Sequence, residues 1–535
     1  MKPVVLLILD GYGIGPAGRG NAIAQAQKPN LDFVEKNFPA VLLQASGAAV
    51  GLPWGEPGNS EVGHTALGTG QLWHQPLTRI TQTIQNGTFF KNPVLKKAAL
   101  HAKENNSAWH LIGLIGSGSV HSYLDHLYAL VEMAASEHIK KIWLHLSSDG
   151  QDSPPKEAAT LIQNLAERLH WIGGGKIASI IGRFYSMDRD GHWDRVEKAW
   201  RLMSEGQGEK TTDFTTALKK QYSQGQSDEY IEPTIGVDES GQTLGLIKDN
   251  DVVIFFDFRA DRVRQLARAV IQPDFKEFPR RGLKNMFYAT LTLYETDLPA
   301  EVIFPAPELK YTLSQIISVS GKKQFKIAET EKYAHVTYFF NGGRESAFPG
   351  EERQLVKSSA AVHFNETPAM KSAEVAESLA AAIKSGNYDF LLANLANADM
   401  VGHTGDQAAT VKAVEALDSA VGKIVSAVLE ANGALVITAD HGNAEEKLNP
   451  LTGEVNTEHT SNPVPLYLVM NNLKKTEPRS EPTAGDSATG ERPHDKSAEV
   501  QGILQDVAAT VLDLMGIPPP GDMDGKSLLP MLYNQ

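Results

Sequence analysis

Three apolar runs decide the fold of this 535-residue chain, and an aspartate follows each of them. They are VVLLIL at 4–9, FLLANL at 390–395 and ALVIT at 434–438, followed by Asp10, Asp399 and Asp440. Continuous apolar runs of this length are typical of strands that are covered on both faces of a parallel sheet. Because ligands of such sheets bind beyond the carboxyl ends of the strands, the three aspartates are candidate ligand-binding residues.

The same alternation extends along the rest of the chain. Further β-rich runs lie at 109–115, 142–146, 176–181 and 252–256. Helical spacing of apolar residues occurs at 156–170 and 371–384. The pattern predicts an α/β protein with layered helices and mostly parallel sheets.

Composition excludes several classes of protein. The chain has no cysteine, which rules out a disulfide framework, a cysteine metal site and a thiol nucleophile. It has 50 basic against 64 acidic residues, and this excess of acid disfavours a nucleic-acid partner. No apolar run approaches the ~20 residues of a membrane span, and the N-terminal run is too short for a signal-peptide core. We therefore expect a cytoplasmic protein without a membrane partner.

Histidines accompany the strand-end aspartates. His403 follows Asp399 by four residues, His441 directly follows Asp440, and His459 lies in NTEHTSNPVP. Carboxylates together with imidazoles suit borderline divalent metals. A single strand-end aspartate is more commonly a helix cap or turn former, so the prediction of a metal centre depends on the whole set.

The candidate nucleophile is Ser60, in GNSEVGH at 58–64. It follows the Gly/Pro-rich loop VGLPWGEPG and precedes a possible helical turn. A helix N-terminus stabilises negative charge, and a metal on the serine oxygen would lower the pKa of the hydroxyl. Without the metal ligands elsewhere, a helix-capping role would be favoured.

Arginines gather in two segments, 182–195 and 257–264. The guanidinium fork matches phosphate and carboxylate, so both segments are candidates for binding an anionic substrate. The three-residue step from Arg259 to Arg262 predicts that both lie on one face of a helical turn. The alternative is ion pairing with the aspartates of the same segments, Asp188, Asp190 and Asp261.

We assign no function to two other stretches of the sequence. Residues 13–18 formally match GxGxxG, but they lie in a long loop instead of opening a helix, so we do not expect a dinucleotide there. Residues 474–499 are polar and rich in Pro and Gly, and we expect a mobile surface loop.

Several motifs, in the same order along the chain, resemble those of cofactor-independent phosphoglycerate mutases of the alkaline phosphatase superfamily. They are LDGYG at 9–13, GNSEVGH at 58–64, VHS at 120–122, NADMVGH at 397–403, TADHGNAE at 438–445 and EHTSNPVP at 458–465. The resemblance runs from Lys2 to about Leu529. It implies an alkaline-phosphatase-like three-layer α/β domain at 1–74 and 309–535, with a second α/β phosphotransferase domain inserted at 75–308.

The resemblance also implies site residues, residue by residue. One divalent ion, expected to be manganese, would be held by Asp399, His403 and His459. A second would be held by Asp10, Ser60, Asp440 and His441. The substrate would be bound by His121, Gln151, Asp152, Arg183, Arg189, Arg259, Arg262 and Lys332. Of these, His121, Asp152 and Lys332 would be catalytic together with Ser60.

The implied reaction interconverts 3-phosphoglycerate and 2-phosphoglycerate without 2,3-bisphosphoglycerate, in glycolysis or gluconeogenesis. Ser60 would take the phosphoryl group as phosphoserine and return it to the other hydroxyl of a glycerate trapped between the domains. His121 or Asp152 would move the proton, and Lys332 would stabilise charge on the transferred group. The family precedent is a monomer.

Some positions depart from the family pattern. Gln151 and Gln71 stand where the family usually has arginine, and Asp257 stands where it usually has asparagine before Phe-Arg. An alternative is therefore a metal-dependent phosphomonoesterase, or a mutase of different substrate specificity. A third possibility is a catalytically silent metal-binding protein with a partner-binding role. The predicted metal ligands do not distinguish manganese from zinc, magnesium or cobalt.

Overall fold

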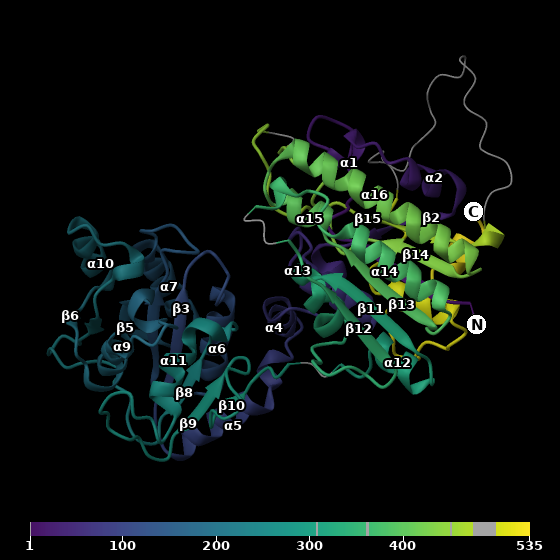
Figure 1. Ribbon diagram of the computed structural model, residues 1–535. Coiled ribbons are helices and arrows are strands. Elements are labelled where there is room, and N and C mark those ends of the chain that lie inside the picture. Colours follow the sequence, from purple (N-terminus) through teal and green to yellow (C-terminus); the bar gives the residue numbers. More distant parts are fainter. Residues whose placement is uncertain (1, 307–308, 360–362, 450–451, 474–498) are drawn as a thin grey trace. The chain divides into compact units, whose positions relative to one another are not determined.

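The structure is a computed structural model, and it describes residues 2–306, 309–359, 363–449, 452–473 and 499–535 (Figure 1). It divides into two compact units. Unit 1 comprises Met1–His74 and Glu308–Gln535, and unit 2 comprises Gln75–Pro307. The expected mobile loop at 474–499 lies outside the described residues, apart from Glu499.

An eight-stranded sheet forms the centre of unit 1. Its strands, in spatial order, are β12 (Glu351–Val356), β11 (Gln324–Glu329), β13 (Phe390–Leu395), β1 (Val4–Leu9), β14 (Ala434–Thr438), β15 (Val464–Val469), β2 (Ala40–Gln44) and β16 (Gly502–Ile503). The strands from β12 to β14 are parallel, whereas β15 runs antiparallel to both of its neighbours. The three runs that end in aspartate are thus the adjacent strands β13, β1 and β14, as their parallel pairing requires.

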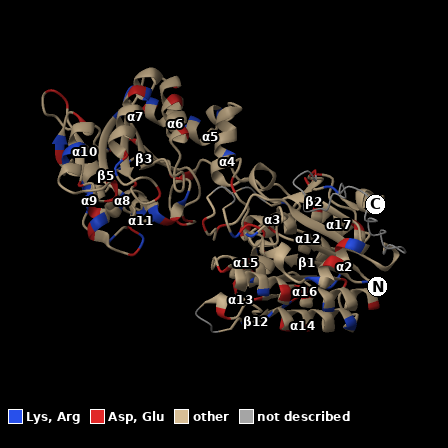
Figure 2. Cartoon of the chain, turned by 90° about the horizontal axis from the view of Figure 1, so that it is seen from above, with Lys and Arg blue, Asp and Glu red and all other residues tan. Residues whose placement is uncertain are grey.

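Helices cover both faces of this sheet (Figure 2). One layer consists of α2 (Pro29–Asn37), α14 (Ser372–Ser385) and α16 (Gln407–Glu430), and the other of α3 (Ser60–Thr69), α12 (Leu313–Val319) and α17 (Asp506–Leu514). Every residue of β1 is buried, which explains its continuous apolar sequence. The short helices are α1 (Ala22–Gln25), α13 (Thr330–Ala334), α15 (Asn397–Gly402) and α18 (Leu529–Leu532).

Unit 2 contains a second eight-stranded sheet. The order is β10 (Glu301–Val302), β9 (Phe287–Thr290), β8 (Val252–Phe255), β3 (Trp109–Ile115), β4 (Ile142–Ser148), β5 (Lys176–Gly182), β7 (Thr234–Gly236) and β6 (Glu209–Thr211). All pairs are parallel except β5 with β7. The prediction of mostly parallel sheets is confirmed in both units.

Alternate residues of one strand in unit 2 serve two hydrophobic cores. Val252 and Ile254 of β8 pack into the core beneath α6 (Leu124–Ser136) and α7 (Ala158–Ile172). Val253 and Phe255 pack into the core beneath α9 (Trp193–Glu205) and α11 (Ala260–Ile271). Because both faces are covered, the strand sequence shows no polar alternation. The remaining helices are α4 (Pro76–Gln85), α5 (Pro93–Glu104), α8 (Arg183–Ser186) and α10 (Phe214–Ser223).

One local expectation is wrong. Arg259 is the N-cap of α11, with extended φ and ψ of −110° and 117°, so it precedes the helical turn that contains Arg262 and is not part of it. The backbone N–H groups of Phe258 and Arg259 donate to the carbonyl oxygen of His121, at 2.8 and 3.3 Å. These hydrogen bonds hold residue 259 extended and delay the helix to Ala260. Within the described residues, no helix is long and apolar enough to cross a membrane.

Candidate active site

Three carboxylates meet at the carboxyl ends of adjacent strands in unit 1. Asp10 follows β1, Asp399 lies in α15 just after β13, and Asp440 follows β14; all three are buried. Gly11 allows this close approach, since its φ is +73° and a Cβ there would lie 2.8 Å from Cα of Asp399. Gly63 does the same for α3, because a Cβ at this position would lie 2.6 Å from the carbonyl oxygen of Asp440.

Ser60 is the first residue of α3 and lies beside these carboxylates. The helix cap is Asn59, whose side chain accepts from the N–H of Val62 at 3.0 Å, so the serine is not needed as a cap. Its Oγ lies 2.9 Å from Nε2 of His441 and donates to Oδ1 of Asp10 at 3.4 Å. The hydroxyl therefore faces the carboxylates from a helix N-terminus, where negative charge on oxygen is stabilised.

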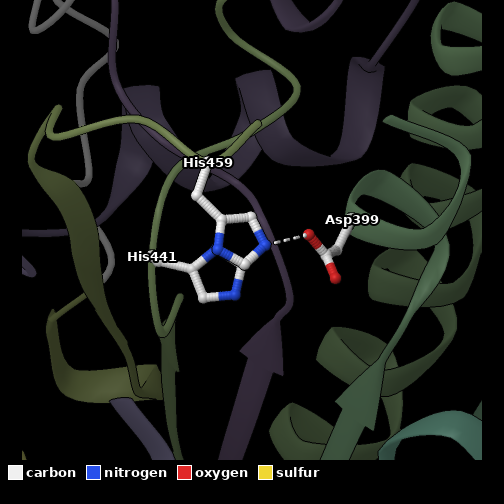
Figure 3. Close-up of side chains that lie close together, drawn as sticks. All are labelled: Asp399, His441 and His459. Atoms are coloured by element: carbon white, nitrogen blue, oxygen red, sulfur yellow. Dashed lines mark ion pairs between the residues drawn. The ribbon is translucent and has the colours of Figure 1, made fainter. Parts of the chain in front are cut away.

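The histidines complete the cluster. Nε2 of His403 and Nε2 of His459 each lie 3.2 Å from Oδ1 of Asp399, and they are 3.0 Å from one another. The ring of His441 stacks on that of His459 with centroids 3.8 Å apart. Figure 3 shows His459 directed at the Asp399 carboxylate with His441 beside it. The structure thus brings the predicted imidazoles and carboxylates together.

The chemistry of this donor set fits divalent cations. Asp399, His441 and His459 form one group whose ligand atoms all lie within 4.8 Å of one another, and Asp10, Asp440 and His441 form another. Oδ2 of Asp440 is buried, and it lies 3.2 Å from Nδ1 of His64 and 3.4 Å from Nε2 of His441. Three buried carboxylates gather here, and Lys332 forms ion pairs with two of them, Asp10 and Asp399. Buried negative charge requires cations in compensation.

Lys332 occupies the middle of the cluster. Its Nζ donates to Oδ1 of Asp10 at 2.6 Å, to Oδ2 of Asp399 at 2.7 Å and to Oγ of Ser60 at 2.7 Å. Burial opposes the charge of Lys332, but Asp10 and Asp399 outweigh it and raise the pKa of the ammonium. In turn, burial would raise the pKa of Asp399, yet Lys332 brings it well below its usual range.

The pKa values of two further groups in this cluster, Asp10 and His403, are also shifted. Burial, followed by the charge of Asp440, raises the pKa of Asp10. The hydrogen bond to Asp399 raises the pKa of His403. The pKa values of Asp10 and Asp399 are thus shifted in opposite directions, which is typical of a functional centre.

Sequence reasoning missed the residues that orient the ligands. Nδ2 of Asn443 donates to Oδ1 of Asp399 at 2.8 Å, and Lys447 in turn holds the amide oxygen of Asn443. Nδ2 of Asn394 donates to Oδ2 of Asp10 at 2.6 Å. The position of Asn443 inside TADHGNAE was a usable signal, whereas nothing in the sequence marks Lys447.

A second cluster of predicted residues lies in unit 2. The buried Arg183 donates through NH1 to Oδ2 of Asp152 at 2.6 Å and also to Asp149. Its NH2 lies 3.3 Å from Nε2 of His121, which is 3.6 Å from Oδ2 of Asp152. Burial and the charge of Arg183 lower the pKa of His121, while Asp261 and Asp152 act in the opposite direction. Asp149 was missed as a partner, although it lies in the same DGQD segment.

Asp261 links two further arginines. It lies 3.4 Å from NH1 of Arg189, 3.0 Å from Nε of Arg259 and 3.6 Å from Nδ1 of His121. The ion-pair alternative for these arginines therefore has support, but both guanidinium groups are about half exposed and remain accessible to a ligand. Arg262 lies half-buried in the first turn of α11.

The two glutamines that depart from the family pattern have defined partners. Gln151 is exposed, and its Nε2 donates to Oε1 of Glu229 at 2.6 Å. Gln71 is half-buried, and its Nε2 donates to the carbonyl oxygen of Tyr311 at 3.0 Å. Gln71 therefore secures a loop of unit 1, while the amide of Gln151 lies beside an acid.

A parallel sheet whose strand ends hold carboxylates and imidazoles around a serine defines a metalloenzyme of the α/β class. The family model of the Metalloenzyme superfamily matches residues 2–519. The 2,3-bisphosphoglycerate-independent phosphoglycerate mutase of Moorella thermoacetica is 43% identical over 529 residues, which cover 99% of this chain and 98% of that protein. The 2,3-bisphosphoglycerate-independent phosphoglycerate mutase 1 of Methanosarcina barkeri is 44% identical over 529 residues, which again cover 99% of this chain and 98% of that protein.

A solved structure is similar over nearly the whole chain. The structure of Leishmania mexicana phosphoglycerate mutase at low cobalt concentration matches with a TM-score of 0.60 and 33% identity, over 98% of this chain and 97% of that one. The chain belongs to the family of 2,3-bisphosphoglycerate-independent phosphoglycerate mutases.

Proposed function

We propose that this protein interconverts 3-phosphoglycerate and 2-phosphoglycerate through a phosphoserine on Ser60, with two divalent metal ions and without 2,3-bisphosphoglycerate. The observation that carries the proposal is the position of the Ser60 hydroxyl, within 3.4 Å of Asp10, His441 and Lys332 at the end of a parallel sheet. The identity to named mutases over nearly the whole chain supports the substrate.

The proposed ligands of the ions are those that cluster at the strand ends. Asp399, His403 and His459 would hold one ion, and Asp10, Ser60, Asp440 and His441 would hold the other. We propose manganese, because mixed carboxylate and imidazole donors accept it. When bound, the ions would lower the pKa of the serine hydroxyl and neutralise charge on the phosphoryl group.

The residues of the chain would carry out two in-line transfers. In the first, Ser60 Oγ, having lost its proton to solvent, forms a bond to phosphorus as the bond from phosphorus to the 3-oxygen breaks. The departing 3-oxygen takes a proton from His121 or Asp152. In the second, the 2-hydroxyl returns a proton to the same group while its oxygen takes the phosphoryl group from Ser60. The ammonium of Lys332 stabilises the transferred charge.

Unit 2 would hold the substrate. His121, Gln151, Asp152, Arg183, Arg189, Arg259 and Arg262 are its proposed ligands, since guanidinium groups bind carboxylate and phosphate. Unit 1 would then be the phosphatase-like domain and unit 2 the phosphotransferase domain. The resemblance to the mutase family is the support for a monomeric cytoplasmic enzyme with a small-molecule partner.

The test is product analysis with the full chain, manganese and 3-phosphoglycerate. We expect 2-phosphoglycerate and a phosphorylated Ser60, with both lost in Ser60→Ala. Release of inorganic phosphate without 2-phosphoglycerate would overturn the mutase and establish the phosphomonoesterase, for which the Gln151 to Glu229 hydrogen bond is the supporting observation. Unchanged turnover in Ser60→Ala would show that Ser60 is not the nucleophile.

A further inference from the structure

A buried carboxyl group lies directly beside the substrate-binding segment of unit 2. Asp257 follows β8, has no exposed surface, and accepts the N–H of Leu114 at Oδ1 over 3.3 Å. Its Oδ2 accepts no hydrogen bond from any described residue. The position depends on Gly113, because a Cβ there would lie 2.7 Å from this oxygen. A carboxylate at this place would lack the donors that normally compensate buried charge.

The backbone around Asp257 is fixed to the proposed substrate ligands. The next two N–H groups, of Phe258 and Arg259, donate to the carbonyl oxygen of His121. The hydroxyl of Tyr294 donates to the carbonyl oxygen of Asp257 at 2.6 Å. The backbone after Asp257 is therefore fixed to that of His121, and the carboxyl of Asp257 is buried.

Few charged groups act on this carboxyl. Among the described residues, Arg183 is the cation that acts electrostatically on it, and the guanidinium of Arg183 is shared with Asp149 and Asp152. Tyr294 is the other titratable group beside it, and burial keeps this phenol neutral by raising its pKa well above the usual value. Burial raises the pKa of Asp257 to about 7, so the group changes charge near neutral pH.

We propose that Asp257 is a positioning residue that sets how the affinity for the anionic substrate depends on pH. The inference rests on the proposed function of unit 2 as the substrate-binding domain. While the carboxyl is neutral, the charge of Arg183 acts on the substrate anion without opposition from Asp257. When the Asp257 carboxyl ionises, its negative charge offsets part of the field of Arg183, and the anion binds more weakly. By linkage, binding of the anion favours the protonated carboxyl.

The test compares the wild type with Asp257→Asn, a variant of the same shape that cannot ionise. In the metal-loaded full chain, the KM for 3-phosphoglycerate is measured from pH 5.5 to 8.5. We expect the ratio of wild-type to variant KM to be near one at the acid end. It should rise to about tenfold at the alkaline end, because the ionised carboxyl repels the anion, while the kcat ratio stays flat.

Asp251→Asn is the matched control. Asp251 is another buried aspartate of unit 2, but it precedes β8 at the opposite end of the strand and pairs with His110. Its variant should keep the wild-type pH profile of KM. A wild-type to Asp257→Asn ratio that is constant with pH would overturn the inference.

Sulfate binding separates this inference from the proposed function. Sulfate does not change protonation in this range, and its dissociation constant is measured for the same three proteins. If the ratio of the wild-type to the Asp257→Asn dissociation constant for sulfate depends on pH, the inference is supported. This holds even if the chain does not turn over phosphoglycerate, because absence of turnover refutes only the proposed mutase activity. A ratio that does not change with pH for either sulfate or substrate refutes the inference alone.

Discussion

The stability of unit 2 should depend on pH through Asp257. Burial raises the pKa of this carboxyl from 3.8 to about 7. Below pH 4 the group is protonated in both the folded and the unfolded chain and has no effect. Between pH 4 and 7 the folded state binds more protons, so the free energy of unfolding falls as pH rises.

The magnitude follows from the shift. About three pKa units at ~1.36 kcal/mol each amount to ~4 kcal/mol of destabilisation that is complete above pH 7. Asp257→Asn removes the ionisation. The free energy of unfolding of the variant minus that of the wild type should therefore increase by ~4 kcal/mol when pH is raised from 4 to 8.

The assay is urea unfolding of the full chain at both pH values, with and without the substitution. Asp251→Asn serves as the control of opposite sign, because hydrogen bonding to His110 outweighs burial and lowers the pKa of Asp251. Stability from that carboxylate is present above its unfolded pKa and is lost as pH falls. A stability difference between wild type and Asp257→Asn that changes by less than ~1 kcal/mol between pH 4 and 8 would refute the reasoning.

Two further predictions concern the two clusters. Asn443→Ala removes the donor that holds Oδ1 of Asp399, and loss of such an orienting hydrogen bond should weaken manganese binding by roughly 10–100-fold in a calorimetric titration. Arg183→Lys keeps the charge but cannot bridge Asp149, Asp152 and His121 together, so kcat/KM for 3-phosphoglycerate should fall by at least ~10-fold in a steady-state assay.

Each of these variants has a control. Asn471→Ala removes an exposed amide whose Nδ2 bonds to the backbone of Leu429, and it should bind manganese as the wild type does. Arg201→Lys changes a surface arginine paired with Glu197, and it should keep its kcat/KM. Unaltered metal affinity in Asn443→Ala, or unaltered kcat/KM in Arg183→Lys, would contradict the assigned roles.

Much of the framework could be predicted because local pattern and burial agree. The strands at 4–9, 109–115, 390–395 and 434–438 have the predicted bounds, since strands covered on both faces are apolar throughout. The helix at 371–384 differs by one residue at each end. Arg259 was misplaced because a hydrogen bond from its N–H to His121, 138 positions earlier in the chain, overrides the helical spacing.

The sequence by itself determined the class of fold, the strand-end aspartates, the serine and the histidines, because residue type, order and spacing along the chain carry that information. Only the tertiary structure decided which groups act on one another. Lys332 lies among Asp10, Asp399 and Ser60, and Asp257 is buried against Gly113 with its Oδ2 not hydrogen-bonded to any described residue. Burial and the distance between charges set these properties, and both arise only when segments far apart in the chain pack together.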